Sequence, residues 1–165
     1  MNEIYHRVSV RKFTQQPIEQ EKILQILKAG MQAPSACNQQ PWEFYVVENK
    51  EKIEALSKAT PYATPCANAP VVIVPVYKTD NLPAPMFAQI DLSISQENMW
   101  LETDSLGLGG VWIGIAPLED RMKEVEKILE IPSHLHAFSL FPIGYPAESR
   151  NQQNRFDENR IHYCK

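Results

Sequence analysis

Apolar residues recur every three or four positions in two parts of the chain, and this spacing predicts two amphipathic helices. The first is expected at residues 19–31, between Pro17 and Pro34. Its apolar side chains, expected to face the core, are Ile23, Ile26, Leu27 and Met31. The second is expected to begin at Pro117, because proline is favourable as the first residue of a helix. Its apolar side chains are Leu118, Met122, Val125 and Leu129.

Three stretches have the aromatic, aliphatic and β-branched composition of strands. They are residues 42–47, 70–77 and 138–145. The second contains an uninterrupted apolar run at 71–74, which predicts a central strand buried on both faces. Because proline cannot donate a backbone hydrogen bond, the regular pairing of this strand is expected to end at Pro75.

The remaining segments complete a mixed architecture. A long helix is expected at 90–106, ending at Gly107, and a short charged helix at 50–59. Apolar residues lie on more than one face of the long helix, which suggests burial at a subunit contact. A proline-rich loop is expected around 82–85, and residues 110–115 form a short apolar stretch. This order of elements predicts the α+β class, as a sandwich and not a simple doubly wound sheet.

Length and composition indicate a globular protein, with 165 residues of which 44% are hydrophobic and 22% charged. One domain over residues 1–165 is expected, with residues 146–165 as a polar C-terminal arm, either disordered or laid over a partner. No apolar run is long enough to span a membrane, and a net charge of -4 argues against nucleic-acid binding through general positive charge. The N-terminus lacks a secretory-signal pattern, so a cytoplasmic location is expected.

The cysteines and histidines do not predict a disulfide or a metal site. Cys37, Cys66 and Cys164 are odd in number and widely spaced, so they are expected to stay reduced. His134 and His136 have no cysteine or carboxylate at ligand spacing beside them, which makes a metal site the weaker interpretation. Cys37 could act as a nucleophile, but no histidine is adjacent in the sequence, and a small packing residue is the favoured interpretation.

Candidate binding chemistry first occurs near the N-terminus. In an extended segment residues two apart point the same way, so Arg7, Ser9 and Arg11 are expected to share one face. Two guanidinium groups and a hydroxyl suit a phosphate monoester, because each arginine can donate paired hydrogen bonds to phosphate oxygens. The alternative is a basic edge strand exposed to solvent, and the pattern taken alone favours that alternative.

A second candidate is the loop at residues 33–42, between the first helix and the first strand. It is rich in small and amide-bearing residues and has a proline near each end. Amide side chains both donate and accept hydrogen bonds, so they could bind the edge of a heteroaromatic ring. A turn that simply ends the helix is the alternative interpretation.

Glycine is concentrated at residues 106–115, which hold four of the 6 glycines in the chain. This concentration indicates backbone with unusual angles or in close approach to a ligand, although a helix end explains Gly107 equally well. The glycines follow an expected helix and precede an expected strand, which is the reverse of the dinucleotide-binding order. A P-loop is excluded because no Gly-Lys-Ser/Thr occurs.

These three segments are followed by the sequence FPIGYPAE at residues 141–148 and then by Arg155. In this arrangement the chain resembles the FMN-dependent nitroreductase-like oxidoreductases, from Arg7 to about Arg155. The resemblance implies a nitroreductase-like α/β/α sandwich with a central mixed, mainly antiparallel sheet. It also implies an intertwined homodimer with two FMN sites at the subunit interface, in which the polar tail wraps the partner.

The resemblance assigns residues to the cofactor site as well. Its phosphate- and ribityl-binding positions match Arg7, Val8, Ser9, Arg11 and Arg155. Its loop beside the flavin matches Pro34, Ser35 and Ala36, and the positions that reach the flavin across the subunit contact match Asn38 and Gln40. The segment near the flavin N5 atom matches Ile113 and Gly114. Gln153 stands where a second basic residue often precedes the late arginine, so phosphate binding is expected to depend on the three arginines.

The implied activity is hydride transfer from NADH or NADPH to N5 of FMN, then reduction of an acceptor such as a nitroaromatic or a quinone, in ping-pong order. No side-chain acid is required, so no catalytic residue is assigned. Two alternatives remain: a specialised flavin-dependent reductase for enones, dehalogenation or flavin breakdown, and a non-catalytic FMN-binding dimer. The stretch at 77–89, where larger relatives often insert substrate-shaping helices, is short and leaves the acceptor open.

Overall fold

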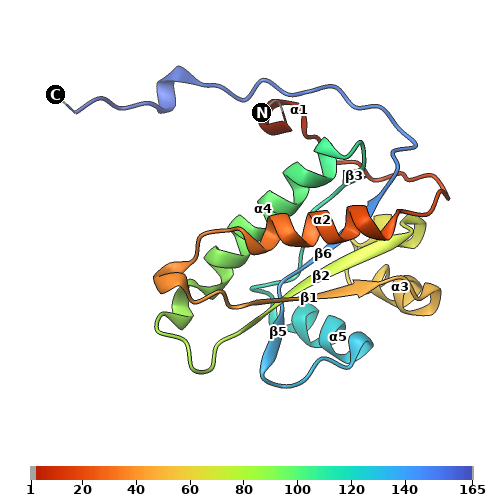
Figure 1. The fold of residues 1–165 in the computed structure, drawn as a ribbon, viewed down its shortest axis with the longest axis horizontal. Coiled ribbons are helices and arrows are strands. Elements are labelled where there is room, and N and C mark those ends of the chain that lie inside the picture. Colours follow the sequence, from red (N-terminus) through yellow and green to blue (C-terminus); the bar gives the residue numbers. More distant parts are fainter. Residues whose placement is uncertain (1–2, 165) are drawn as a thin grey trace.

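The computed structural model describes residues 3–164, and a six-stranded sheet forms its centre (Figure 1). The strands are β1 Trp42–Val47, β2 Val71–Lys78, β3 Gly109–Gly110, β4 Ile113–Gly114, β5 Leu135–Ala137 and β6 Ser139–Gly144. The main path runs β1-β2-β6-β3, with β5 beside β2 and β4 beside β6. These pairs are antiparallel, and a parallel bridge between Ser9 and Gly110 adds the N-terminal segment.

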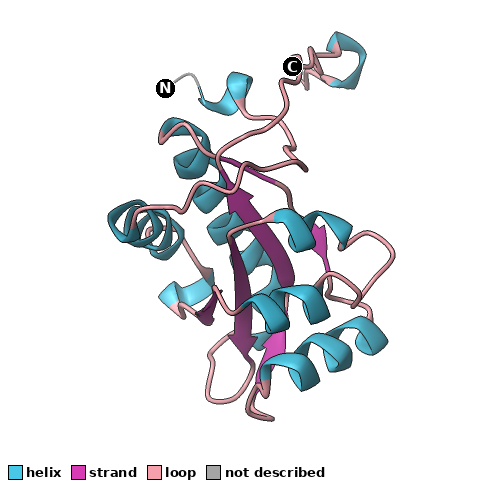
Figure 2. Cartoon of the chain, turned by 90° about the vertical axis from the view of Figure 1, so that its right-hand side faces the viewer, coloured by secondary structure: helices cyan, strands magenta, loops and turns pink. Residues whose placement is uncertain are grey.

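Helices cover both faces of the sheet (Figure 2). α2 (Gln20–Met31) and α4 (Ala88–Ser105) pack together on one face, whereas α3 (Lys50–Leu56) and α5 (Glu119–Leu129) lie on the other. The shorter helices are α1 Glu3–His6 and the 3₁₀ helices η1 Ala36–Asn38, η2 Thr64–Asn68, η3 Pro85–Phe87 and η4 Glu158–Arg160. The predicted α+β sandwich is confirmed.

β2 explains why both covering layers are needed. Successive side chains of a strand point to opposite faces, so Val71 and Ile73 join the core beneath α2 and α4. The core beneath α3 and α5 receives Val72, Val74 and Val76. All five side chains are buried, and each such burial stabilises the fold by roughly 1.5–3 kcal/mol. The predicted central strand is therefore confirmed.

The prediction that the pairing of β2 ends at Pro75 is wrong. Pro75 lies opposite Phe44, and β2 continues to Lys78, paired with both β1 and β5. Between β6 and β5 the register shifts by one residue at Phe138, whose backbone N–H donates to the Pro75 carbonyl at 3.0 Å. The missing N–H of the proline thus falls where the ladder is irregular. The predicted strand 138–145 corresponds to β6, and the same irregularity separates β6 from β5, which ends at Ala137.

The other elements differ from the predictions mainly at their ends. α2 and β1 lie where expected, and α4 begins two residues before its predicted start. α4 is followed by Gly107, whose φ of 72° is in the left-handed region that favours glycine. Pro117 does not open α5, because the next residue, Leu118, is extended (φ −84°, ψ 101°) and the helix begins at Glu119. α1 and β5 were not predicted, since 4 and 3 residues are too few for a periodic pattern.

The C-terminal tail is attached to the sheet only at its base. Pro146 forms a bridge with Phe13, and the Ala147 N–H donates to the Lys12 carbonyl at 2.9 Å. Residues 149–164 then run away from the sheet and are almost all exposed (Figure 1). Among residues 3–164, no helix has the length and apolar character needed to cross a membrane.

Candidate functional site

Two glycines allow the N-terminal segment to lie against the edge of the sheet. The Val10 N–H donates to the Gly110 carbonyl at 3.0 Å, next to the bridge formed by Ser9. A Cβ atom on Gly109 would lie 2.7 Å from the Val10 side chain, and one on Gly110 would lie 2.7 Å from Phe141. These approaches are too close for any other residue. Gly109 therefore leaves room for the segment that carries the arginines, and Gly110 leaves room for Phe141 of β6.

Arg7 is a charged residue that is largely buried, with a side chain 12% exposed. Its guanidinium carbon lies 3.9 Å from the centroid of the Trp100 ring, a favourable cation–π contact. Its Nε atom is 3.5 Å from Glu97 Oε1. The Nη1 atom is buried and has no hydrogen-bond partner among the described residues. Because a buried donor without an acceptor is costly, this arrangement suits an anionic ligand that supplies the acceptor.

Three neighbouring hollows follow this edge of the molecule. The first, of about 600 Å³, is lined by Arg7 and Arg155 with residues from α1 and the tail. The second, of about 400 Å³, is lined by Ser9, Arg11 and Arg155. The third, of about 450 Å³, is lined by Arg11 and by both residues of β4. Arg155 borders the first two hollows and Arg11 the last two, so the three hollows are neighbours along this edge, and together they are named here the edge path.

The edge path brings together seven of the residues predicted from the sequence: Arg7, Val8, Ser9, Arg11, Ile113, Gly114 and Arg155. The second hollow, in the middle of the edge path, is lined by arginines and is therefore cationic. The third hollow is lined by Tyr62, Trp112 and Ile113. Gly114 is exposed, and nothing lies within 4 Å of the position that a Cβ would take. A flat group could therefore approach the Gly114 backbone closely.

Two residues of the third hollow were missed by sequence reasoning. Tyr62 is 68% exposed, and the Arg121 guanidinium lies 5.5 Å from the centroid of its ring. Arg121 also donates from Nη1 to the Gly114 carbonyl at 3.4 Å. An aromatic residue between Pro61 and Pro65 was an available signal for an exposed, stiffened loop. Arg121 offered no signal, because it lies among the polar residues of an amphipathic helix.

The loop that the resemblance places beside the cofactor lies elsewhere in the chain. In Figure 1 it is at the far end of α2 from the N-terminal segment. Accordingly, none of the three hollows is lined by Pro34, Ser35, Ala36, Asn38 or Gln40. The φ angles of Cys37, Asn38 and Gln40 are 50°, 52° and 45°, all in the left-handed region. Gln40 donates to Ser35 Oγ through its backbone and to Asn38 Oδ1 through its side chain, both at 3.0 Å.

Asp91, in the first turn of α4, holds this loop. Its carboxylate accepts hydrogen bonds from the Ala36 N–H at 2.9 Å and from Gln39 Nε2 at 2.7 Å, and the residue is 2% exposed. Gln39 also exchanges two hydrogen bonds with the Ala84 backbone, at 2.9 and 3.1 Å. Sequence reasoning missed Asp91, because acidic residues are common in the first turn of any helix.

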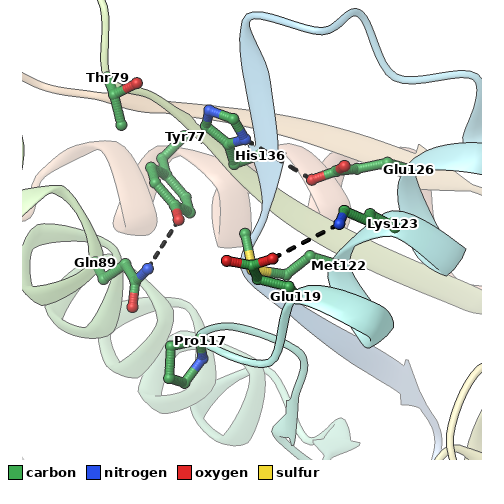
Figure 3. A pocket seen from close by; sticks show the side chains of 9 residues that line it. All are labelled: Tyr77, Thr79, Gln89, Pro117, Glu119, Met122, Lys123, Glu126 and His136. Carbon is green, nitrogen blue, oxygen red and sulfur yellow. Dashed lines mark hydrogen bonds and ion pairs between the residues drawn. The ribbon is translucent and has the colours of Figure 1, made fainter.

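A separate hollow of about 440 Å³ lies between α5 and the end of β2 (Figure 3). Gln89 donates to the Tyr77 hydroxyl at 2.8 Å, and His136 Nδ1 lies 3.9 Å from Glu126 Oε1. Burial raises the pKa of Tyr77. None of the sequence-predicted site residues lines this hollow, and residues 3–164 contain no group of three or more side chains placed to hold a metal ion. The predicted binding chemistry lies instead along the edge path.

The three cysteines are all free. Cys66 is fully buried, and this burial raises the pKa of its thiol to about 12. Cys37 and Cys164 are exposed, but none of the three lines the edge path.

Comparison with known proteins places the chain among relatives of similar length. The profile of the Nitroreductase family matches residues 4–64 and 57–145. A protein of Methanothermobacter thermautotrophicus, provisionally named an NADH dehydrogenase/NAD(P)H nitroreductase, is 40% identical over 159 residues. The match covers 96% of this chain and 83% of that protein.

Solved structures share the fold. A protein of Clostridium acetobutylicum, provisionally named an NADH oxidase, superposes with a TM-score of 0.95 at 39% identity, covering 99% of each chain. An FMN-dependent nitroreductase of Clostridium difficile superposes with a TM-score of 0.91 at 29% identity, covering 99% of this chain and 98% of that one. With its profile match, its identity to these relatives and this fold, the chain belongs to the nitroreductase family.

Proposed function

We propose that the chain is an NAD(P)H-dependent oxidoreductase that binds FMN along the edge path. The observation that carries the proposal is the buried, unpartnered Nη1 of Arg7 next to the hollow lined by Ser9, Arg11 and Arg155. Guanidinium groups and a hydroxyl are the donors that suit a phosphate monoester. The related C. difficile protein is FMN-dependent by name, which supports the same cofactor here.

The third hollow suits a ring system attached to that phosphate. Tyr62, Trp112 and Ile113 supply apolar and aromatic contact surface, and the exposed Gly114 leaves room for a flat group to approach the backbone. FMN, when bound, would supply the redox chemistry, accepting hydride from NADH or NADPH and reducing a second substrate such as a nitroaromatic or a quinone. The chain itself holds the phosphate, positions the ring and leaves one side open. Because both substrates would use that open side, they would bind in turn, as in a ping-pong reaction.

The proposal includes a homodimer. Exposed apolar side chains gather on η3 and α4: Met86, Phe87, Ile90 and Ile94. An exposed cluster of this kind is typical of a protein interface, and the loop at 34–40 is joined to the same helix through Asp91. Pairing of two copies through this face would let Asn38 and Gln40 of one subunit reach the edge path of the other. We also propose that residues 1–165 form a single domain, that the C-terminal tail covers the partner subunit and that the protein is cytoplasmic.

The visible absorption spectrum tests the proposal most directly. The purified full-length protein, with FMN added if it is isolated colourless, should show a bound-flavin spectrum that bleaches when NADH or NADPH is added without oxygen. Re-oxidation by menadione or a nitroaromatic would then identify a general reductase. Protein that binds no FMN would refute the proposal. Flavin that binds but is not reduced by either nucleotide would support the alternative of a non-catalytic FMN-binding dimer.

A further inference from the structure

The hollow lined by Ser9, Arg11 and Arg155 contains one more arginine, Arg150, to which no role has been assigned. Gln153, also at this hollow, is uncharged. Arg150 comes from the C-terminal tail, whereas Ser9 and Arg11 come from the opposite end of the chain. Arg150 can therefore take part in binding only if the fold holds this part of the tail beside the N-terminal segment.

Consecutive contacts fasten residues 145–148 to residues 11–14. They are Thr14 N–H to the Tyr145 carbonyl at 2.9 Å, the bridge between Phe13 and Pro146, Ala147 N–H to the Lys12 carbonyl at 2.9 Å, and Arg11 N–H to Glu148 Oε1 at 2.8 Å. The tail is thus fixed to the N-terminal segment up to Glu148. The Glu148 side chain, 16% exposed, is the last member of this series.

Glu148 in turn holds the Arg150 guanidinium by two parallel hydrogen bonds. Arg150 Nε donates to Glu148 Oε1 at 3.0 Å, and Nη2 donates to Oε2 at 3.2 Å. The bonds from Arg150 and from the Arg11 N–H lower the pKa of Glu148, so it stays ionised at neutral pH. A guanidinium has five N–H groups, and this fork uses two. The Nη1 edge of Arg150, opposite the fork, is left free for another acceptor.

At this end of the edge path, two arginines have an acidic partner and two do not. Glu97 forms an ion pair with Arg7, and Glu148 holds the plane of the Arg150 guanidinium through its two hydrogen bonds. Arg11 and Arg155 are exposed at the hollow they share, and neither forms an ion pair with an acidic side chain among residues 3–164. They leave about two positive charges in excess, which matches the roughly −1.5 to −2 charge of a phosphate monoester at neutral pH.

We propose that Arg150 is a phosphate-binding residue, that Glu148 positions it, and that the pair makes the site selective for a phosphorylated flavin over riboflavin. This inference rests on the proposed function, because it takes FMN as the ligand. It adds a fourth arginine to the prediction that phosphate binding depends on Arg7, Arg11 and Arg155. It also explains how the chain binds phosphate with Gln153 at this hollow.

The test compares Arg150→Gln with a matched control, Arg160→Gln. Arg160 is in the same tail, is 83% exposed, and donates one hydrogen bond to a neighbouring acid, Asp157, at 3.2 Å, but it lines none of the hollows of the edge path. Full-length wild-type and variant proteins are stripped of flavin and titrated with FMN and, separately, with riboflavin, following the quenching of flavin fluorescence. Thermal melting of each protein shows that it is folded.

We expect Arg150→Gln to weaken FMN binding at least about tenfold, the usual loss for a hydrogen bond to a charged group. Riboflavin binding should change less than about twofold, and Arg160→Gln should change neither. An Arg150→Gln variant that binds FMN as tightly as the wild type overturns this inference and leaves the proposed function intact. Equal losses for FMN and riboflavin also overturn it, because the contact would then not be to the phosphate. Wild-type protein that binds no FMN overturns the proposed function first, and this inference with it.

Discussion

Replacing Asp91 by alanine should loosen the loop at 34–40 and destabilise the fold measurably. The Asp91 carboxylate is buried and accepts two hydrogen bonds, from the Ala36 N–H and from Gln39 Nε2. The loop contains three residues with left-handed φ angles, at 37, 38 and 40. Each such residue is held in a conformation that costs on the order of 1 kcal/mol. Without the carboxylate, the loop would keep its internal hydrogen bonds and those between Gln39 and Ala84, but it would lose its attachment to α4 through Asp91.

The magnitude follows from the two hydrogen bonds. Hydrogen bonds to a charged acceptor contribute about 1.5–3 kcal/mol each. Part of this is regained in Asp91→Ala, because the Ala36 N–H is only half-buried and water can reach it, and because Gln39 keeps its bonds to Ala84. We therefore expect a loss of about 3 kcal/mol in the free energy of unfolding. Asp91→Asn should lose about half as much, since its amide nitrogen cannot accept from Gln39.

Urea unfolding followed by tryptophan fluorescence, at one fixed protein concentration, measures this loss. The series consists of wild type, Asp91→Ala, Gln39→Ala and the double variant, so that the coupling between the two side chains is obtained directly. Asp80→Ala is the control, because Asp80 is an exposed acid in the turn after β2 and should change stability by less than about 0.5 kcal/mol. A loss below about 1 kcal/mol for Asp91→Ala, or additive effects in the double variant, would refute the assigned role of Asp91.

Two further predictions follow from the edge path and from the core. Arg11→Ala should weaken FMN binding by about 2 kcal/mol, roughly thirtyfold. This is the low end for a charged contact, because Arg11 is exposed. A variant that purifies with a full complement of FMN would contradict the role of Arg11. Iodoacetamide at pH 8 should modify Cys164 but spare Cys66, because Cys66 is buried and its pKa is raised to about 12. Mass spectrometry before and after unfolding in urea checks this, and native Cys66 that reacts as fast as Cys164 would show that the core opens readily.

The elements that could be predicted from the sequence are those whose pattern repeats within one segment. α2 and β1 carry a periodic or alternating apolar pattern over at least six residues, and the structure confirms both. Pro75 was misjudged because its effect depends on the strand beside it. The shift of register at Phe138 accommodates the missing N–H of Pro75. The sequence of β2 alone cannot predict that shift. β5 was missed for the same reason, since its 3 residues gain their pairing only from β2.

The candidate site was predictable to the extent that its residues are adjacent in the sequence. Arg7, Ser9 and Arg11 were selected for their spacing, and they do border neighbouring hollows. The spacing could not show that Arg7 lies on Trp100 and faces Glu97, which is what distinguishes a built site from an exposed basic strand. Such contacts join segments about ninety residues apart. Tyr62, Arg121 and Arg150 were missed because only the folded chain brings them to the edge path.

Flavin binding and subunit association should form one linked equilibrium, because the residues assigned to the cofactor lie at two distant places in one chain. Arg7 and Arg11 border the edge path, whereas the loop at 34–40, which contains Asn38 and Gln40, lies at the other end of α2 (Figure 1). A ligand that binds mainly the dimer must stabilise the dimer, and dilution that separates the subunits must weaken its binding. We therefore expect bound FMN to be released, with recovery of its fluorescence, as the protein is diluted through the dissociation range of the dimer.

Substitutions on exposed apolar residues separate this linkage from simple loss of affinity. Ile94→Glu, on the 37% exposed position of α4, should move the release of FMN to higher protein concentration. Leu118→Glu, at a 49% exposed residue beside α5, is the control and should leave it unchanged. Analytical ultracentrifugation at the same concentrations identifies the dimer. FMN that stays bound while the protein becomes monomeric would show that one chain holds the whole site, and Asn38 and Gln40 would then have no part in binding the flavin.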